Sequence, residues 1–212
     1  MTPETCSKPK PQRSLPKMTQ TIREAARDSG FTQSSDELTG SFLATLAASK
    51  PGGRFLELGT GVGSGSAWLL SGMDAASSLT TVERNAEQVE IAKRHLAHDP
   101  RITFWVGDGA AYLRQTQGSF DFIFADTKPG KISHPELALN LVAPGGFYVV
   151  DDMNLGWTDE ADLVDISDYL LTVWQGQRAL MAVLGARADF LCTRLDWSTG
   201  LMLCTKHTPK GV

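Results

Sequence analysis

Short apolar segments alternate five times with segments of helical periodicity, and this alternation limits the possible folds more than any other feature of the chain. The apolar segments are residues 54–58, 79–83, 102–106, 121–125 and 147–150. The helical segments are residues 64–70, 86–97, 110–114, 135–141 and 159–174. Strands that alternate with helices form parallel sheets covered on both faces. We therefore predict a doubly wound α/β fold.

The two ends of the chain add to this prediction. Residues 189–194 and 200–205 read as strands around a short turn, which predicts an antiparallel hairpin at one edge of a mostly parallel, seven-stranded sheet. Ser34 and Glu37 stand three positions apart and predict a capping box for a helix that runs to about Ser49. Residues 1–17 are rich in proline and lysine and predict a flexible tail, so residues 18–212 would form a single domain.

Composition excludes several classes of function. The net charge of −4 disfavours sequence-independent binding to nucleic acid or to anionic lipid. The sequence contains neither an apolar run of membrane-spanning length nor a secretory leader, so we expect a cytoplasmic protein. Three cysteines without C-x-x-C spacing do not indicate a disulfide framework or a zinc site, and we expect Cys192 and Cys204 to be small core residues.

The strongest local signal is the segment 57–65, which reads ELGTGVGSG directly after the first strand. Alternate glycines let the backbone turn tightly and approach a ligand, and the next helix offers N–H groups to an anion. The dinucleotide fingerprint G-x-G-x-x-G fails, because its third glycine would fall on Ser64, Ser66 or Trp68. The remaining pattern, E-x-G-x-G-x-G, resembles the first motif of class I S-adenosylmethionine-dependent methyltransferases.

Acidic residues follow the next strands and extend this resemblance. Glu83 ends the second strand, where a carboxylate can accept hydrogen bonds from a ribose diol. Asp108 lies in a Gly-Asp-Gly turn. The resemblance implies that its carboxylate accepts a hydrogen bond from the adenine amino group, and the alternative is that Asp108 caps the N-terminus of the next helix. The expected cofactor-binding residues are Glu57, Gly59, Thr60, Gly61, Gly63, Ser64, Glu83, Arg84, Asp108, Gly109 and Asp126.

The segments 120–129 and 142–153 resemble the small O-methyltransferases of the catechol and caffeoyl-CoA type. In that family an Asp after the fourth strand and an Asp-Asn pair after the fifth bind a divalent cation. Asp126 and Asp151 match these positions, whereas Asp152 replaces the Asn. The resemblance therefore implies a site for Mg²⁺ or Ca²⁺. The extra carboxylate would weaken acidification of a bound hydroxyl, so a metal-free site is the alternative.

The same family has a lysine three residues after the first metal-binding Asp, and this chain has Pro129 there. Lys128 and Lys131 flank it, and either could approach the acceptor beside Asp126 or be a solvated loop charge. His134 could be a base, although capping or exposure suits its place before a helix better. Trp157 could form a wall for a planar acceptor or pack on the core.

The sequence thus predicts transfer of a methyl group from S-adenosylmethionine to a small hydroxylated, catechol-like molecule. A methyltransferase acting on tRNA or protein is an alternative, which the acidic balance disfavours. A nicotinamide-dependent oxidoreductase is a second alternative, which is disfavoured because the sequence lacks the third glycine of the dinucleotide fingerprint. A non-catalytic module that binds S-adenosylmethionine is a third, because Pro129 and Asp152 depart from the family pattern. The resemblance also implies a homodimer.

Overall fold

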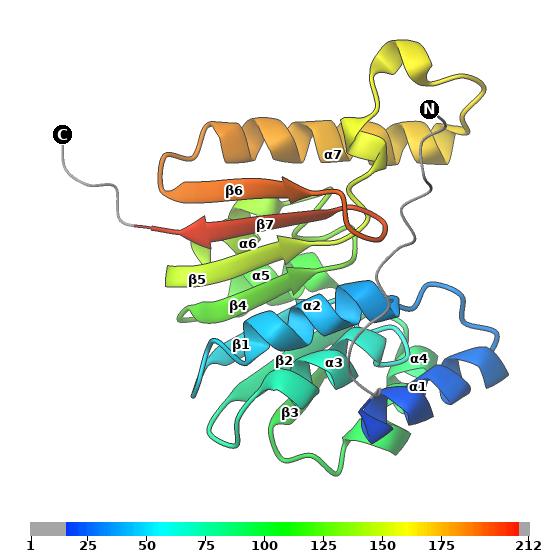
Figure 1. Cartoon of the computed structure of the whole chain (residues 1–212), viewed down its shortest axis with the longest axis vertical. Helices are drawn as coiled ribbons and strands as arrows, with labels where there is room; N and C mark the ends of the chain where they lie inside the picture. The colour runs from blue at the N-terminus through cyan, green and yellow to red at the C-terminus, as the bar shows by residue number, and fades with distance from the viewer. Residues whose placement is uncertain (1–15, 208–212) are drawn as a thin grey trace, which may run out of the picture.

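The computed structural model describes residues 16–207 and contains one seven-stranded sheet in the order β3-β2-β1-β4-β5-β7-β6 (Figure 1). Strands β3 to β5 pair in parallel, whereas β7 pairs antiparallel with both β5 and β6. The predicted fold class is therefore confirmed. The strands are β1 (Arg54–Leu58), β2 (Ser78–Glu83), β3 (Ile102–Val106), β4 (Phe120–Ala125), β5 (Val142–Val150), β6 (Phe190–Leu195) and β7 (Leu201–Lys206).

Helices cover both faces of the sheet. One face packs against α1 (Lys17–Asp28), α2 (Glu37–Ala47), α3 (Ser64–Gly72) and α4 (Ala86–Leu96). The other face packs against α5 (Gly109–Gln115), α6 (Pro135–Asn140) and α7 (Asp168–Gly185). Two short 3₁₀ turns, η1 (Leu155–Trp157) and η2 (Glu160–Asp162), lie between β5 and α7.

The alternation of side chains along each strand divides the core into two layers. In β4, Phe122 and Phe124 pack beneath α2 and α3, while Ile123 and Ala125 face α5 and α6. All four side chains are buried. Burying an aromatic or branched side chain contributes about 1.5–3 kcal/mol, so a central strand that is apolar on both faces holds the two layers together.

The order of the strands reverses between β1 and β4, and this determines where a ligand can bind. Leu58 pairs with Ala125, and Ala125 pairs with Val150. The residues that follow these strands therefore leave the sheet side by side at its carboxyl edge. In open α/β sheets, ligands bind at such a switch point.

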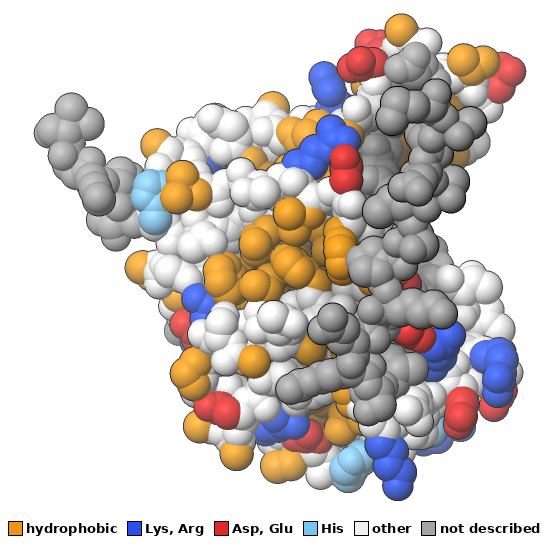
Figure 2. Space-filling view, viewed as in Figure 1, with side chains coloured by type: hydrophobic (Ala, Val, Ile, Leu, Met, Phe, Trp, Pro, Cys, Tyr) orange, Lys and Arg blue, Asp and Glu red, His pale blue; other side chains and the backbone are white. Residues whose placement is uncertain are grey.

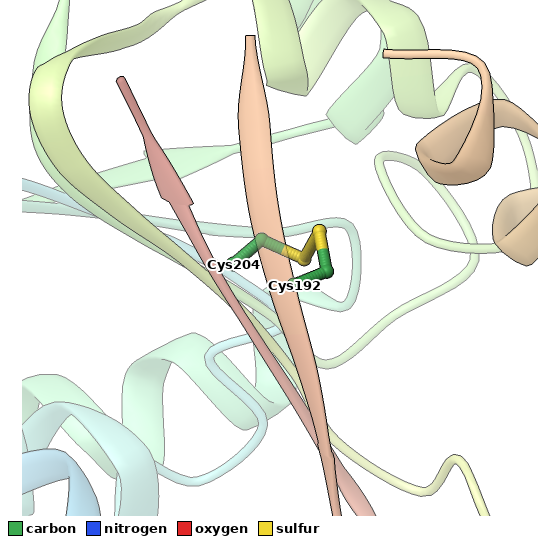
Figure 3. The surroundings of a disulfide bond; sticks show 2 residues. All are labelled: Cys192 and Cys204. Atoms are coloured by element: carbon green, nitrogen blue, oxygen red, sulfur yellow. A yellow bond between two sulfur atoms is a disulfide. The ribbon is translucent and has the colours of Figure 1, made fainter. Parts of the chain in front are cut away.

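Cys192 and Cys204 form a disulfide bond between β6 and β7 (Figure 3). They face each other directly in the register of the hairpin, with their Cα atoms 4.0 Å apart. The expectation of no disulfide is therefore wrong; Cys204 is buried in the core as predicted, whereas Cys192 is exposed. Their sequence separation of 12 gives no motif, and only the strand pairing places them opposite each other.

Two predicted helix boundaries are also wrong. The last helix spans Asp168–Gly185 and not residues 159–174, because Ser167 is the residue that caps it, accepting a hydrogen bond from the Leu170 N–H at 3.3 Å. At α2, the cap is Asp36, which accepts from the Thr39 N–H at 2.8 Å. The predicted cap, Ser34, has a buried hydroxyl without a hydrogen-bond partner in the described residues.

The fifth strand begins earlier than the predicted residue 147, because residues 142–146 also belong to β5, where its register with β4 shifts. At the N-terminus, α1 begins at Lys17 and is preceded by Pro16. The other residues of the expected tail, 1–15, lie outside the described residues.

Hydrophobic side chains gather near the middle of the face in Figure 2, where β5 and β7 are seen in Figure 1. Among residues 16–207, no helix combines the length and the apolarity that crossing a membrane requires.

Candidate active site

A cavity of about 630 Å³ lies at the carboxyl edge of the parallel strands. Its walls also include the loop before α2 and the first turns of α7. Most of the predicted site residues line it: Gly59, Thr60, Gly61, Ser64, Glu83, Arg84, Asp108, Gly109, Asp126, Lys128, Lys131 and Asp152. The structure thus brings these residues into one space, although their individual binding roles stay predictions.

The loop after β1 can be formed only by glycines. Gly59, Gly61 and Gly63 have backbone φ angles of 105°, 50° and 98°, in the region that residues other than glycine rarely adopt. A Cβ atom on Gly59 would lie 2.7 Å from the backbone oxygen of Asp126. Gly63 does not line the cavity but packs against Leu96 of α4, so its role is to shape the loop.

Glu57 lies beneath this loop and not in the cavity. Its side chain is fully buried and accepts hydrogen bonds from the hydroxyls of Ser66 and Thr81, the latter at 2.6 Å. Burial raises the pKa of Glu57 from 4.5 to about 7, although these two hydroxyl donors oppose the shift. Glu57 does not line the cavity, because its carboxylate points into the protein behind the glycine loop, and its contact with a cofactor stays a prediction.

Glu83 connects the glycine loop to the end of β2. One carboxylate oxygen accepts from the Gly61 N–H at 3.2 Å, and the other accepts from the Asn85 N–H at 2.9 Å. Each oxygen retains capacity for a further bond on the side that lines the cavity. The neighbouring Asp108 caps α5 by accepting a hydrogen bond from the Ala111 N–H at 2.9 Å, and it also lines the cavity.

A half-buried carboxyl group, Asp126, and a buried one, Asp151, lie at the neighbouring ends of β4 and β5. Burial, followed by the charge of Asp151, raises the pKa of Asp126 well above its usual range. Burial, followed by the charge of Asp152, raises the pKa of Asp151 to about 6. Asp151 accepts from the Thr199 hydroxyl at 2.7 Å and from the Asp152 N–H at 2.8 Å. Lys131 lowers the pKa of both groups and so opposes their repulsion.

The third acid of the predicted metal site lies differently. Asp152 has a φ of 54°, and its side chain is 59% exposed. One of its carboxylate oxygens lies 3.6 Å from the Lys131 ammonium, whose side chain is only 6% exposed. Within residues 16–207, no three His, Cys, Asp or Glu side chains are grouped to hold a metal ion. The structure therefore does not support the predicted site at Asp126, Asp151 and Asp152, because a lysine is paired with one of its acids.

The other end of the cavity is more apolar. Lys128 is exposed and lies with its ammonium 5.0 Å from the centre of the Tyr169 ring at the start of α7. Leu155, Leu170 and Val173 also line this end. Together they provide a half-apolar space for a ligand of moderate size.

Two further candidates lie outside the cavity. His134 precedes α6 with a φ of 57°, and its Nε2 lies 2.8 Å from the Arg114 guanidinium. Trp157 packs against the core, with the Arg194 guanidinium 4.0 Å from its ring centre. Neither lines the cavity, so neither is placed to act on an acceptor bound there.

Comparison with known proteins finds similarity to a family in the middle of the chain. Residues 56–153, which include the glycine loop and the acids at the ends of β1 to β5, match a family described as a methyltransferase domain. A protein of Mycobacterium avium that is provisionally named an O-methyltransferase is 34% identical over 125 residues. The middle of the chain is therefore similar to a methyltransferase domain.

The match to the M. avium protein covers 55% of this chain and 55% of that relative, so the chain spans about half the length of the relatives it matches first. Two solved structures share the fold. An O-methyltransferase from Bacillus cereus in complex with SAH has a TM-score of 0.77 at 21% identity, covering 91% of this chain and 92% of that chain. TomG from Streptomyces achromogenes, in complex with SAM, has a TM-score of 0.76 at 24% identity, covering 92% of each chain.

Sequence reasoning missed part of the cavity wall. Phe31, Gln33, Ser34 and Ser35, between α1 and α2, line the end with the glycine loop, and a Cβ on Gly61 would lie 2.9 Å from the Phe31 ring. Tyr169, Leu170, Val173 and Gln177 of α7 line the opposite end. No motif marks these residues. Only the apolar positions at helical spacing after Ser167 could have indicated that one side of α7 faces a ligand.

Proposed function

We propose that the protein transfers a methyl group from S-adenosylmethionine to a hydroxyl oxygen of a small, catechol-like molecule. The observation that carries this proposal is the composition of one cavity. Backbone N–H groups and the acids Glu83 and Asp108 line one end, and Asp126, Lys131 and apolar side chains line the other. A nucleoside cofactor and a small acceptor would therefore meet inside one cavity.

The cofactor end fits S-adenosylmethionine in shape and in charge. The glycine loop leaves no side chain between its backbone and the ligand. Glu83 would accept hydrogen bonds from the ribose diol while keeping its bond to the Gly61 N–H. Asp108 would accept from the adenine amino group while it caps α5. The bound cofactor would supply a methyl group on a positively charged sulfur.

At the acceptor end, the residues of this chain would orient and activate the hydroxyl. The Asp126 carboxylate would receive the hydroxyl proton, and the Lys131 ammonium would stabilise the negative charge on the oxygen. The oxygen–methyl bond then forms as the sulfur–methyl bond breaks. Lys128 and Tyr169 would contact the body of the acceptor, and most of the rate would come from holding the two reactants in line.

The comparisons support this proposal in general terms. The M. avium relative carries an O-methyltransferase name, and the structure of TomG contains SAM and is described as involved in tomaymycin synthesis. Those statements concern the other proteins, and here they support the choice of cofactor and of an oxygen acceptor. The homodimer and the absence of nucleic-acid partners stay predictions.

Formation of S-adenosylhomocysteine with a panel of catechols tests the reaction directly. We expect turnover with at least one catechol and none when Asp126 is replaced by asparagine. Binding of the cofactor without turnover on any hydroxylated acceptor would contradict O-methylation and favour a non-catalytic binding module. Absence of cofactor binding would contradict the proposal as a whole.

Replacing Glu83 by alanine is expected to weaken S-adenosylhomocysteine binding by about 10- to 100-fold, because hydrogen bonds to a charged group contribute about 1.5–3 kcal/mol. Isothermal titration calorimetry measures the change. Glu87→Ala is the matched control, since Glu87 is exposed in the first turn of α4 and does not line the cavity. Equal dissociation constants for the two variants would remove the ribose role from Glu83.

The cytoplasmic location expected from the sequence also stays a proposal. The Cys192–Cys204 disulfide counts against it, because disulfides are rare where cellular thiols are kept reduced. Thiol labelling of protein extracted under acid would show which form the chain has in the cell.

A further inference from the structure

A tight turn between β4 and α6 carries Lys131 into the interior. The Ile132 N–H donates to the Lys128 carbonyl at 2.9 Å, and the Gly130 N–H donates to the Ser133 carbonyl at 2.7 Å. The buried hydroxyl of Tyr148, on β5, donates to the Gly130 carbonyl and fixes the turn to the sheet. The turn thus determines the position of the lysine, which a flexible surface loop would leave undetermined.

The Lys131 ammonium is placed among acids. Lysine is rarely buried without a charged partner, and here its side chain is 6% exposed with Asp152 at 3.6 Å. Asp126 and Asp151 leave neighbouring strand ends, and Lys131 acts electrostatically on both. One buried cation therefore offsets the negative charge of a cluster of three carboxyl groups.

The same cluster is poorly arranged for a divalent cation. Asp151 already uses one oxygen to accept from Thr199 and from a backbone N–H. Asp152 turns outward, and no three-ligand group occurs in the described part of the chain. A divalent cation placed here would also be repelled by the buried ammonium, at a distance where charges interact strongly.

We propose that the Lys131 ammonium occupies the place of a divalent cation, balancing Asp126 and Asp151 and facing the acceptor oxygen, so that the protein works without a metal ion. This inference rests on the proposed function only for the role of the acceptor. Its electrostatic part concerns the protein alone, and it can be tested without cofactor or acceptor.

The experiment is a titration of the full chain with Mn²⁺, followed by electron paramagnetic resonance of the unbound ion. Three proteins are compared: wild type, Lys131→Met and Lys128→Met. Lys128 is the matched control, because it is exposed and its partner is the Tyr169 ring, not an acid. Lys131→Met keeps the length and apolar character of the side chain and removes only the charge.

We expect no saturable site in wild type or in Lys128→Met, and one saturable Mn²⁺ site in Lys131→Met that is lost when Asp151→Asn is added. A saturable site in wild type that Asp151→Asn removes would overturn the proposal. Absence of binding in all three proteins would also overturn it, since Lys131 would not be what keeps cations out of the cluster.

If Lys131→Met does not fold, thermal unfolding of the wild type decides the question. We expect its Tm in 5 mM EDTA and its Tm in 5 mM Mg²⁺ to differ by no more than about one degree. A larger rise of the Tm in Mg²⁺ would overturn the proposal. Methyl transfer, once found, should keep its rate within about two-fold in EDTA. Neither binding measurement contains cofactor or acceptor, so their failure is distinguishable from failure of O-methylation.

Discussion

Replacing Gly59 by alanine is expected to abolish measurable cofactor binding and to lower the free energy of unfolding by about 3 kcal/mol. The φ of 105° costs a residue with a Cβ roughly 1–2 kcal/mol. The new Cβ would also lie 2.7 Å from the Asp126 carbonyl oxygen, which belongs to the backbone and cannot rotate away. Overpacking of this kind costs about 1–3 kcal/mol.

This substitution acts on both ends of the cavity at once. Gly59 lies directly after β1 and Asp126 directly after β4, so relief of the clash must move the glycine loop, Asp126 or both. Urea unfolding and calorimetry measure the two effects. Gly185→Ala is the control, because its Cβ would meet no atom within 4 Å. Wild-type stability and binding in Gly59→Ala would show that the loop tolerates a shift.

The sequence was informative where chemistry follows strand ends. Glu83, Asp108 and Asp126 line one cavity because parallel strands that alternate with helices present their carboxyl ends at one edge. The acid of the E-x-G-x-G-x-G motif does not line the cavity, since Glu57 is the last but one residue of β1 and its side chain points under the loop. Alternation along the strand decides this, and the motif alone does not show it.

Most of what could not be predicted depends on pairings between separate segments. The Cys192–Cys204 bond depends on hairpin register, and the Lys131–Asp152 pair depends on where the turn after β4 meets β5. The start of α7 was misplaced because acidic residues from Asp159 onward resemble a first helical turn, whereas the capping residue is Ser167. The first two features depend on contacts between separate segments of the chain, whereas the third depends on the local choice of capping residue.

Replacing Glu57 by glutamine is expected to stabilise the protein above neutral pH by about 3 kcal/mol and to have little effect near pH 4.5. In the unfolded chain Glu57 ionises near 4.5, whereas in the fold its pKa is about 7. Between these values the folded state holds more protons than the unfolded state, so the wild type loses stability as the pH rises. Glutamine carries no charge at any pH and avoids that loss.

Urea unfolding of the wild type and of Glu57→Gln at pH values from 5 to 8 measures this difference. It should grow as the pH rises to about 7 and then stay constant, because above that pH the wild-type carboxylate is ionised in both states. The glutamine oxygen can still accept from the hydroxyls of Ser66 and Thr81, so these bonds are retained. Glu24→Gln, an exposed change on α1, is the control and should give a flat difference. A difference for Glu57→Gln that is equally flat would mean that Glu57 ionises normally, and that the polar pocket beneath the glycine loop compensates for its burial.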